Sequence, residues 1–337
     1  MQRLRRLVVG LLCGLGLCAA GATLAQSPVT AASASASAGT YPDHPIRIVI
    51  GFAAGGGTDA VLRSIASKLS ESLGVSVFVD NKPGANGNIA NDIVAKAPAD
   101  GYTLLYNTSS MVLSPHLYAK LTYNFETELT PIALTANIPL ALVVPLTVPV
   151  SNMAEFIAYL KQNPDKVNYA SAGNGNVTHL ATIQMLMSTG TQAIHVPYRS
   201  EAPALTDVMG GQVQFYLGTA NALIPLIRQG RVRPLAVGSL KRMEQLPDVP
   251  TISETILPGV EFGAWSGFMA PAKTPPEIIA KLNAEINKAL ADPALRAKII
   301  STGAEVRGST VDQYAKFLKS EYKRWGEAVK AADLKPE

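Results

Sequence analysis

The sequence predicts an α/β fold in which strands and helices alternate along the chain. From Tyr41 onward, short runs rich in β-branched residues lead into polar or glycine-rich loops, and apolar residues at helical spacing follow the loops. Such alternation is typical of parallel βαβ units with helices on both faces of a sheet. The 337-residue chain is long enough for two packed cores.

The first 25 residues have the pattern of a secretory signal peptide. Three arginines precede an apolar run from Leu7 to Ala20, and small residues lead to Ala25. Because this run is shorter than the roughly 20 residues of a membrane anchor, we predict cleavage after Ala25 and a periplasmic mature protein. Residues 26–40 are rich in alanine and serine, which predicts a flexible spacer.

Cysteine usage and charge exclude several classes of protein. Cys13 and Cys18 lie in the segment predicted to be removed, and neither follows the small residue that lipoprotein processing prefers. We therefore expect a mature chain with no thiol, disulfide or cysteine-bound metal. Cleavage removes three of the 29 lysines and arginines, which leaves a formal charge near +1 against 25 acidic residues. Nucleic acid is excluded as a partner because its binding requires a concentrated basic face.

Three strands and two helices are predicted between Tyr41 and Tyr106. The first helix follows a glycine-rich loop, and its apolar residues recur every three or four positions, at Leu62, Ile65, Ala66, Leu69 and Leu73. The predicted strands are Ile46–Ile50, Val75–Asp80 and Tyr102–Tyr106, and the predicted helices are Thr58–Leu73 and Ala85–Ala97.

The middle of the chain continues this alternation, and the last quarter does not. Predicted in order are a strand at Leu140–Val144, a helix at Met153–Gln162, a strand at Val167–Ala170, a helix at Val177–Thr189, and strands at Phe215–Leu217 and Leu235–Val237. Three helices are predicted near the end, at Pro275–Ala291, Pro293–Ser301 and Val311–Ala332, with a strand only near Glu305. We expect this helical layer to pack back on the first sheet.

Prolines mark two candidate crossings between lobes. They lie near Asn137–Pro139 and near Asp248–Thr251. If the chain forms two lobes, these segments are the expected hinges, although proline-marked loops are also typical of plain surface turns.

The first glycine-rich turn, Gly55 to Gly57, predicts an anion site. It lies between a predicted strand and helix, with Thr58 or Asp59 as the helix N-cap. A helix N-terminus presents unpaired N–H groups and a partial positive charge, and glycines let a ligand approach the backbone. A triphosphate is excluded, because no lysine follows the glycines until Lys68.

Two other anions fit this turn. Gly55-x-Gly57-x-x-Ala60 matches a dinucleotide-binding pattern, and Asp80 stands where a ribose-binding acid is expected, so a secreted NAD(P)-dependent oxidoreductase is an alternative. Export of the protein disfavours that alternative. A carboxylate needs only the backbone donors.

A second glycine-rich turn favours the carboxylate. Gly173 to Asn176 again separates a predicted strand from a helix, which begins with Val177, Thr178 and His179. The two turns lie on opposite sides of the first candidate crossing. We therefore expect two helix N-termini to converge on one small anion.

The sequence contains no catalytic or metal-binding pattern that we can assign. The four histidines, His44, His116, His179 and His195, do not have metal-ligand spacing. We expect His179 to pair with a backbone carbonyl. Ser109 and Ser171 lie outside a G-x-S-x-G motif, and no Asp/His set can be assigned to them. We predict a non-enzymatic protein without a cofactor or metal.

Several segments of the mature chain resemble one known family. They are YPDHPIRIVIGFAAGGGTDAVLR, VFVDNKPGANGNIA, KAPADGYTLLY, NYASAGNGNVTHLA, HVPYRSEAPALTDVMGGQV, LPDVPTISETILPG and FMAPAKTPPEIIAKLNAEINKAL. The sequence is similar to the Bug family, the extracytoplasmic solute receptors of tripartite tricarboxylate transport systems.

The resemblance implies a two-lobe periplasmic binding protein of type II, with a hinge between the lobes. The implied lobes are residues 41–138 with 250–337, and residues 139–249. A monomer of this kind closes over a small carboxylate, held partly through ordered water by the two glycine-rich turns. It then delivers the ligand to membrane transporter subunits.

The resemblance also implies ligand-binding residues. The first turn contributes Phe52, Ala54, Gly57, Thr58 and Asp59, with Asp59 in a structural role. The polar wall after the third strand contributes Thr108 and Ser109, and the second turn contributes Ser171, Asn176 and Thr178. Later in the chain, Arg199 is expected to meet a second carboxylate or to form a surface ion pair, and Thr219 and Asn221 complete the set.

Two departures from the family pattern bear on the ligand. Gly51 stands where the family often has proline, which predicts a looser strand end. The family's Asp-Asn pair after GGQV is replaced by the run Leu217 to Asn221, which argues against an amino-bearing ligand, and Gly218 is expected to make room for a larger one. Both an aliphatic dicarboxylate and an aromatic diacid such as terephthalate fit these expectations.

Overall fold

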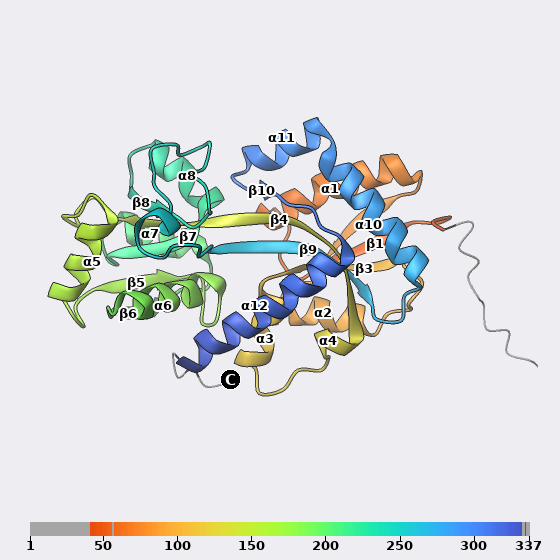
Figure 1. The fold of residues 1–337 in the computed structure, drawn as a ribbon, viewed down its shortest axis with the longest axis horizontal. Helices are drawn as coiled ribbons and strands as arrows, with labels where there is room; N and C mark the ends of the chain where they lie inside the picture. Colours follow the sequence, from red (N-terminus) through yellow and green to blue (C-terminus); the bar gives the residue numbers. More distant parts are fainter. Residues whose placement is uncertain (1–40, 56, 332–333, 335–337) are drawn as a thin grey trace, which may run out of the picture. The chain divides into compact units, whose positions relative to one another are not determined.

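A mixed sheet with helices on both faces forms the framework of the protein (Figure 1). The structure is a computed structural model that describes residues 41–55, 57–331 and 334. The predicted signal peptide and spacer lie outside the described residues. The ten strands follow the order β2-β1-β3-β9-β4-β7-β5-β6, and β8 and β10 both pair with β4.

One half of the sheet contains the first strands of the chain. β1 (Ile46–Ile50) is parallel to β2 (Val77–Asn81) and β3 (Thr103–Thr108), whereas β9 (Gly263–Pro271) is antiparallel to β3 and β4. β10 (Glu305–Val306) adds to β4. The helices of this half are α1 (Gly57–Leu73), the 3₁₀ turn η1 (Ala85–Gly87), α2 (Asn88–Ala95), α3 (Ser110–Leu117), α4 (Phe125–Glu128), α10 (Pro276–Ala291), α11 (Pro293–Ser301) and α12 (Val311–Ala331).

The other half is built on β5 (Asn168–Ser171), which is parallel to both β6 (Ile194–Pro197) and β7 (Phe215–Thr219). β7 and β8 (Arg233–Val237) are antiparallel to the end of β4. The helices here are α5 (Met153–Gln162), α6 (Val177–Thr189), α7 (Glu201–Met209), α8 (Ala220–Arg228) and α9 (Ile252–Thr255).

β4 (Leu129–Val144) connects the two halves. Its first part pairs with β9 as far as Pro139, which is opposite Gly263, and from Leu140 onward its partners are β7 and β8. Asn137 and Pro139 therefore lie in β4 where the partner strand changes. Thr251, in the other candidate crossing, forms a bridge with Val237 at the end of β8.

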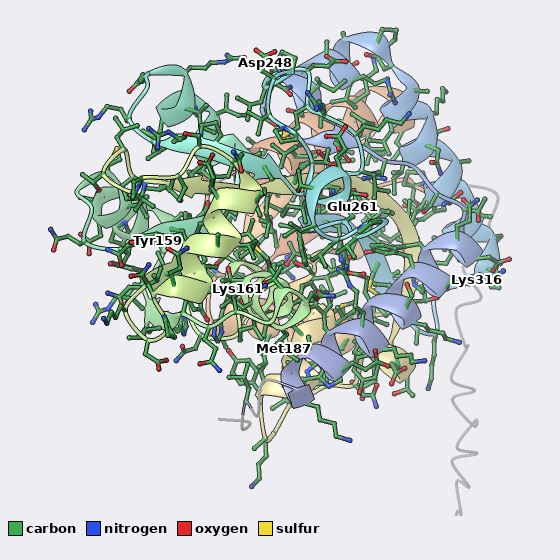
Figure 2. All side chains as sticks on the ribbon, turned by 60° about the vertical axis from the view of Figure 1, so that its left-hand side comes forward. Tyr159, Lys161, Met187, Asp248, Glu261 and Lys316 are labelled. Carbon is green, nitrogen blue, oxygen red and sulfur yellow. The ribbon has the colours of Figure 1, made fainter. Side chains whose placement is uncertain are left out.

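The terminal helices pack on the first half of the sheet, as predicted. Leu282 and Ile286 of α10 are buried in one apolar cluster with Ile48 and Ile50 of β1. α12 is anchored by Glu321, whose Oε2 accepts hydrogen bonds from the indole nitrogens of Trp265 at 2.8 Å and Trp325 at 3.0 Å. Surface side chains such as Lys316 extend from the opposite face of α12 (Figure 2).

Most predicted elements are present, but some bounds were wrong. The helices predicted at Met153–Gln162, Val177–Thr189 and Pro293–Ser301 have these bounds in the structure. The helix predicted at Ala85–Ala97 is interrupted at Asn86, which has φ 53°. β6 and β9 were not predicted, and β4 begins well before Leu140. β4 contains two prolines, which are rare inside strands, so its first part was not predicted as a strand. Register shifts beside Pro131 and after Leu134 let this part pair with β9.

Gly238 joins three chain segments at the point where β4 changes partners. Its N–H donates to Leu140 O at 2.6 Å, its carbonyl accepts from Phe262 N–H at 2.8 Å, and Leu140 N–H donates to Phe262 O at 2.9 Å. A Cβ at position 238 would collide with the carbonyl oxygen of Phe262. Only glycine fits this triple junction without a backbone shift.

We predict that Gly238→Ala lowers the free energy of unfolding by about 1 to 3 kcal/mol, the usual cost of overpacking. Chemical denaturation at neutral pH measures the change. Gly210→Ala is the matched control, since a Cβ there makes ordinary contacts, 3.4 Å or longer, in a right-handed backbone. Equal stability of the Gly238→Ala variant and the control would contradict this account of the junction.

Candidate functional site

The first glycine-rich turn is closed by Asp59, which is 2% exposed. One carboxylate oxygen accepts from Gly55 N–H at 2.9 Å and from Arg63 Nε at 2.8 Å, and the other accepts from Asn81 Nδ2 at 2.9 Å. The amide of Asn81 also donates to Phe52 O at 2.9 Å. These contacts connect the turn to α1 through Arg63 and to the end of β2 through Asn81.

The charge of Asp59 is stabilised by these donors. Burial alone raises the pKa of Asp59, but the hydrogen bonds from Arg63, Asn81 and the Gly55 amide together lower it below the ordinary value of 3.8. The carboxylate therefore stays ionised at neutral pH. Its negative charge offsets part of the partial positive charge at the N-terminus of α1.

Gly51 packs tightly, so the prediction of a looser strand end was wrong. A Cβ at Gly51 would collide with the Cα of Gly87, at the start of α2. A Cβ at Gly87 would lie 3.4 Å from Ser110 Oγ and 3.8 Å from the ring of Phe52. The missing side chain thus lets the η1–α2 loop approach the first turn and the polar wall.

The polar wall is buried. Thr108 is 8% exposed and Ser109 is 3% exposed. The hydroxyls of Thr108 and Ser110 lie 2.8 Å apart, and Ser109 N–H donates to Trp265 O at 3.1 Å. The end of β3 and the start of α3 therefore present hydroxyl groups beside Phe52.

The second turn is held by its own side chains. Asn176 caps α6, its Oδ1 accepting from Thr178 N–H at 3.0 Å, and Thr178 Oγ1 accepts from Ala172 N–H at 2.9 Å. Ser171 is fully buried, and its Oγ lies 2.6 Å from Nε2 of His195. Ser171, Asn176 and Thr178 are thus brought together, but much of their hydrogen-bonding capacity is used inside the turn.

His179 pairs with an amide, so the expectation of a carbonyl partner was wrong. Its Nδ1 accepts from Gly175 N–H at 3.1 Å. His195 stacks on it, and sequence reasoning missed this pairing. The pairing depends on strand order: β6 lies beside β5, which places His195 opposite Tyr169 in the sheet. No local sequence pattern indicates this neighbour.

Glu201 of α7 supplies an acid at Thr219. Its carboxylate accepts from Thr219 N–H at 3.0 Å, Thr219 Oγ1 at 2.8 Å and Tyr216 Oη at 2.9 Å. An acid therefore lies at this corner although the run from Leu217 to Asn221 contains none. The expectation that Gly218 makes room for a larger ligand was wrong, because the ring of Tyr216 fills the space that a Cβ would need.

Contacts join the two glycine-rich turns to the opposite halves of the sheet. A Cβ at Gly57 would collide with the side-chain amide of Asn221, at the start of α8. Similarly, a Cβ at Gly175 would collide with the side chain of Leu117, at the end of α3. Arg199 stays exposed in the segment after β6. Ala54 is also exposed, and Thr58 is half-buried.

Asp80, the ribose-binding acid of the dinucleotide alternative, is already paired with basic side chains. Asp80 Oδ2 accepts from Arg47 at 2.6 Å, and Asp80 Oδ1 lies 3.3 Å from Lys82 Nζ. In the part of the chain that the structure describes, no group of three or more His, Cys, Asp or Glu side chains could hold a metal ion. None of the described helices combines the length and apolarity that spanning a membrane requires.

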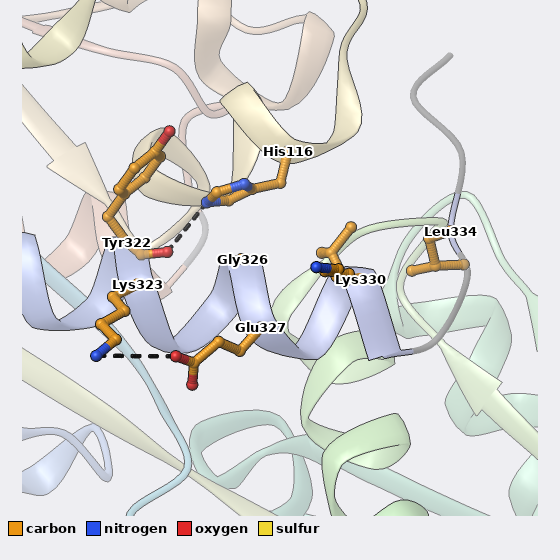
Figure 3. A pocket seen from close by; sticks show the side chains of 8 residues that line it. His116, Tyr322, Lys323, Gly326, Glu327, Lys330 and Leu334 are labelled. Carbon is orange, nitrogen blue, oxygen red and sulfur yellow. Dashed lines mark hydrogen bonds and ion pairs between the residues drawn. The ribbon is translucent and has the colours of Figure 1, made fainter.

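Figure 3 shows a cavity of about 550 Å³ between α12 and His116 of α3. His116 Nε2 lies 3.0 Å from Tyr322 O, and Lys323 pairs with Glu327 at 4.0 Å. None of the residues predicted to bind ligand lines this cavity. It is therefore separate from the candidate site.

The two-part sheet and the paired helix N-termini define a two-lobe solute-binding protein. Residues 61–334 match the family described as the tripartite tricarboxylate transporter family receptor, TctC. The chain belongs to this family, whose members include the Bug proteins. It is a receptor of the periplasmic binding protein class rather than an enzyme.

Three solved structures are similar over nearly the whole chain. Rpa4515 of R. palustris with adipate has a TM-score of 0.79 and 35% identity, covering 88% of this chain and 100% of that one. The periplasmic binding protein BugD has a TM-score of 0.75, 35% identity and the same coverages. MatC from Rhodopseudomonas palustris with bound malate has a TM-score of 0.73 and 32% identity, covering 86% of this chain and 100% of that one.

We predict that Asp59→Asn lowers the free energy of unfolding at pH 7 by about 1 to 3 kcal/mol, because an amide cannot accept all three hydrogen bonds. The folded-state pKa of Asp59 is lowered, so its stabilisation is present above its ordinary pKa of 3.8 and is lost as pH falls below it. Urea denaturation at neutral and acidic pH measures the difference between the variant and the wild type. Asp312→Asn, at an exposed position, is the control. A difference that stays constant down to pH 3 would show that the Asp59 charge is not involved.

Proposed function

We propose that this receptor binds a small carboxylate between the two glycine-rich turns and delivers it to a tripartite tricarboxylate-type membrane transporter. The single observation that supports this most is the contact between Gly57 at the start of α1 and Asn221 at the start of α8. It brings a helix N-terminus of one half of the sheet against a side-chain amide donor of the other. Backbone and amide donors at helix N-termini favour an anionic guest.

Each group of residues in the proposed site has a different role in binding. Gly57 and Thr58 offer donors from α1, and Asn176 and Thr178 shape the start of α6. Phe52 and Ala54 of the first turn line the site together with the polar wall of Thr108 and Ser109. Ser171, Thr219 and Asn221 complete the opposite side. Asp59 keeps the first turn in shape, and Arg199 is proposed to meet a second carboxylate at the rim.

We further propose that the lobes are residues 41–138 with 250–337, and residues 139–249, and that they close on the ligand as a monomer. The change of strand partner after Pro139 supports a hinge in β4. Backbone hydrogen bonds also connect Leu140 to Gly238, just after β8, and to Phe262, just before β9, so three chain segments meet at the proposed hinge. Hinges of this kind need only a few residues to change conformation.

A dicarboxylate is the favoured ligand class. Two neighbours of similar fold have adipate and malate bound, and both are small dicarboxylates. Because Tyr216 fills the space beside Gly218, nothing at that position favours a bulkier guest. An aromatic diacid such as terephthalate is the bulkier alternative, and we include it in the test panel for comparison with the aliphatic acids.

The test compares free acids with their esters. A carboxylate ligand at 100 times its dissociation constant raises the free energy of unfolding by about 2.7 kcal/mol. We predict that adipate, malate or terephthalate raises the melting temperature of residues 26–337, and that the dimethyl ester of the same acid does not. Thermal-shift assays and calorimetry measure both.

Gly57→Val locates the carboxylate. The extra side chain displaces Asn221 and covers the backbone donors, and one or two lost charge-assisted hydrogen bonds weaken binding on the order of tenfold or more. Thr58→Val keeps the shape and removes only a hydroxyl, which separates side-chain from backbone contributions. Unchanged affinity in Gly57→Val would place the carboxylate elsewhere, and binding of NAD(H) without binding of any acid would favour the oxidoreductase alternative.

A further inference from the structure

A stacked pair of histidines, His179 of α6 and His195 of β6, lies against the second turn. The ring centroids of His179 and His195 are 3.7 Å apart and the rings are inclined by 9°. The ring centroid of Tyr169 of β5 lies 4.9 Å from that of His195 and 6.2 Å from that of His179. β5, β6 and α6 lie together in Figure 1, and the three rings that they carry form one cluster against the second turn.

Each histidine contacts one atom of the turn. Gly175 N–H donates to Nδ1 of His179 at 3.1 Å, and Ser171 Oγ lies 2.6 Å from Nε2 of His195. A backbone N–H is always a donor, so Nδ1 of His179 must carry no proton. Only the neutral imidazole with its proton on Nε2 makes this contact. A second proton on His179 would place two N–H groups face to face.

The described residues that line the cavity beside the histidine pair include no carboxylate side chain. A cavity of about 300 Å³ lies beside the pair, lined by both histidines, by Asn174 and Gly175, and by Leu117, Tyr118 and Leu334. Other titratable groups nearby are Tyr169 of β5, Tyr216 of β7 with its partner Glu201 of α7, and Lys330 of α12, which lines the cavity of Figure 3 together with Leu334.

We propose that His179 and His195 are positioning residues of the second turn: the neutral pair holds the turn in its binding geometry, and a proton on His179 releases it. This rests on the proposed role of the turn as a carboxylate site. Gly175 also packs against Leu117 of α3, so release of the turn loosens a contact between the two halves of the sheet. Binding and closure then both weaken in acid.

The direction of the pH dependence follows from burial. Burial and the neighbouring His195 lower the pKa of His179 from 6.5 to about 3, and burial lowers the pKa of His195 to about 4. A histidine in the released turn has its ordinary pKa near 6.5. The free-energy difference that favours the held turn is therefore largest above about pH 6.5. It decreases as pH falls from there toward the lowered pKa values.

The experiment follows the apo protein, residues 26–337, by NMR from about pH 7.5 to about pH 4.5. The readouts are the Gly175 amide resonance and its hydrogen-exchange rate, with the imidazole resonances as the record of protonation. His179→Asn is the test variant, because its side-chain oxygen replaces Nδ1 as an acceptor and does not titrate. His44→Asn is the matched control, since His44 is exposed and lies beside Asp43 and Tyr102, outside the second turn.

We expect the Gly175 amide to lose protection in acid in the wild type and in His44→Asn, and to keep it in His179→Asn. With adipate and malate as probes, protonation of the acids themselves weakens binding to both proteins alike. Between about pH 7.5 and about pH 5, the affinity of the wild type should fall on the order of tenfold more than that of His179→Asn. The same acid response in wild type and His179→Asn overturns the proposal. Because the NMR readouts need no ligand, failure of every acid to bind would count against the proposed function alone.

Discussion

The fold depends on one strand, β4, that pairs with strands of both halves of the sheet. β4 pairs with β9 over its first part and with β7 and β8 over its last, so every other element is placed relative to it. Pro139 lacks a backbone donor, and it falls where the partners change. The next residue, Leu140, resumes hydrogen bonding with Phe262 and Gly238, which binds the two halves together at a narrow junction.

The junction also explains why helix N-termini from different halves meet. β1 and β3 run parallel in one half and β5 and β7 in the other, so the loops after β1, β3, β5 and β7 lead directly into α1, α3, α6 and α8. Each of these helices begins with unpaired N–H groups. Asp59 accepts from Gly55 N–H just before α1, Asn176 accepts from Thr178 N–H of α6, and Glu201 accepts from Thr219 N–H at the N-cap of α8. The donors that remain define where a ligand anion can bind.

This arrangement favours selectivity for small anions. Asp59 and Glu201 place fixed negative charges beside two of the helix starts, and like charges repel. A ligand carboxylate is therefore stabilised only at the donors that these acids leave open. The neutral histidine pair beside α6 adds no negative charge, which makes the second turn the least opposed part of the proposed site.

The α/β class, the two glycine-rich turns, most strands and helices, and the family could all be predicted from the amino-acid pattern. These features depend on local order: apolar periodicity, glycine between strand and helix, and contiguous family segments. The pattern failed at β9 and at the start of β4, because pairing with distant strands stabilises segments whose own pattern is weak.

The surroundings of each candidate site residue could not be predicted in this way, because they come from contacts between distant segments. The sequence suggested free space at Gly218, but the ring of Tyr216 fills it. The segment from β7 to α8 contains no acid, and Glu201 of α7 supplies one at Thr219. His179 and His195 became a pair because β6 lies beside β5, behind the start of α6. Contacts of this kind join residues far apart in sequence, and they depend on strand order and helix placement, which no local pattern encodes.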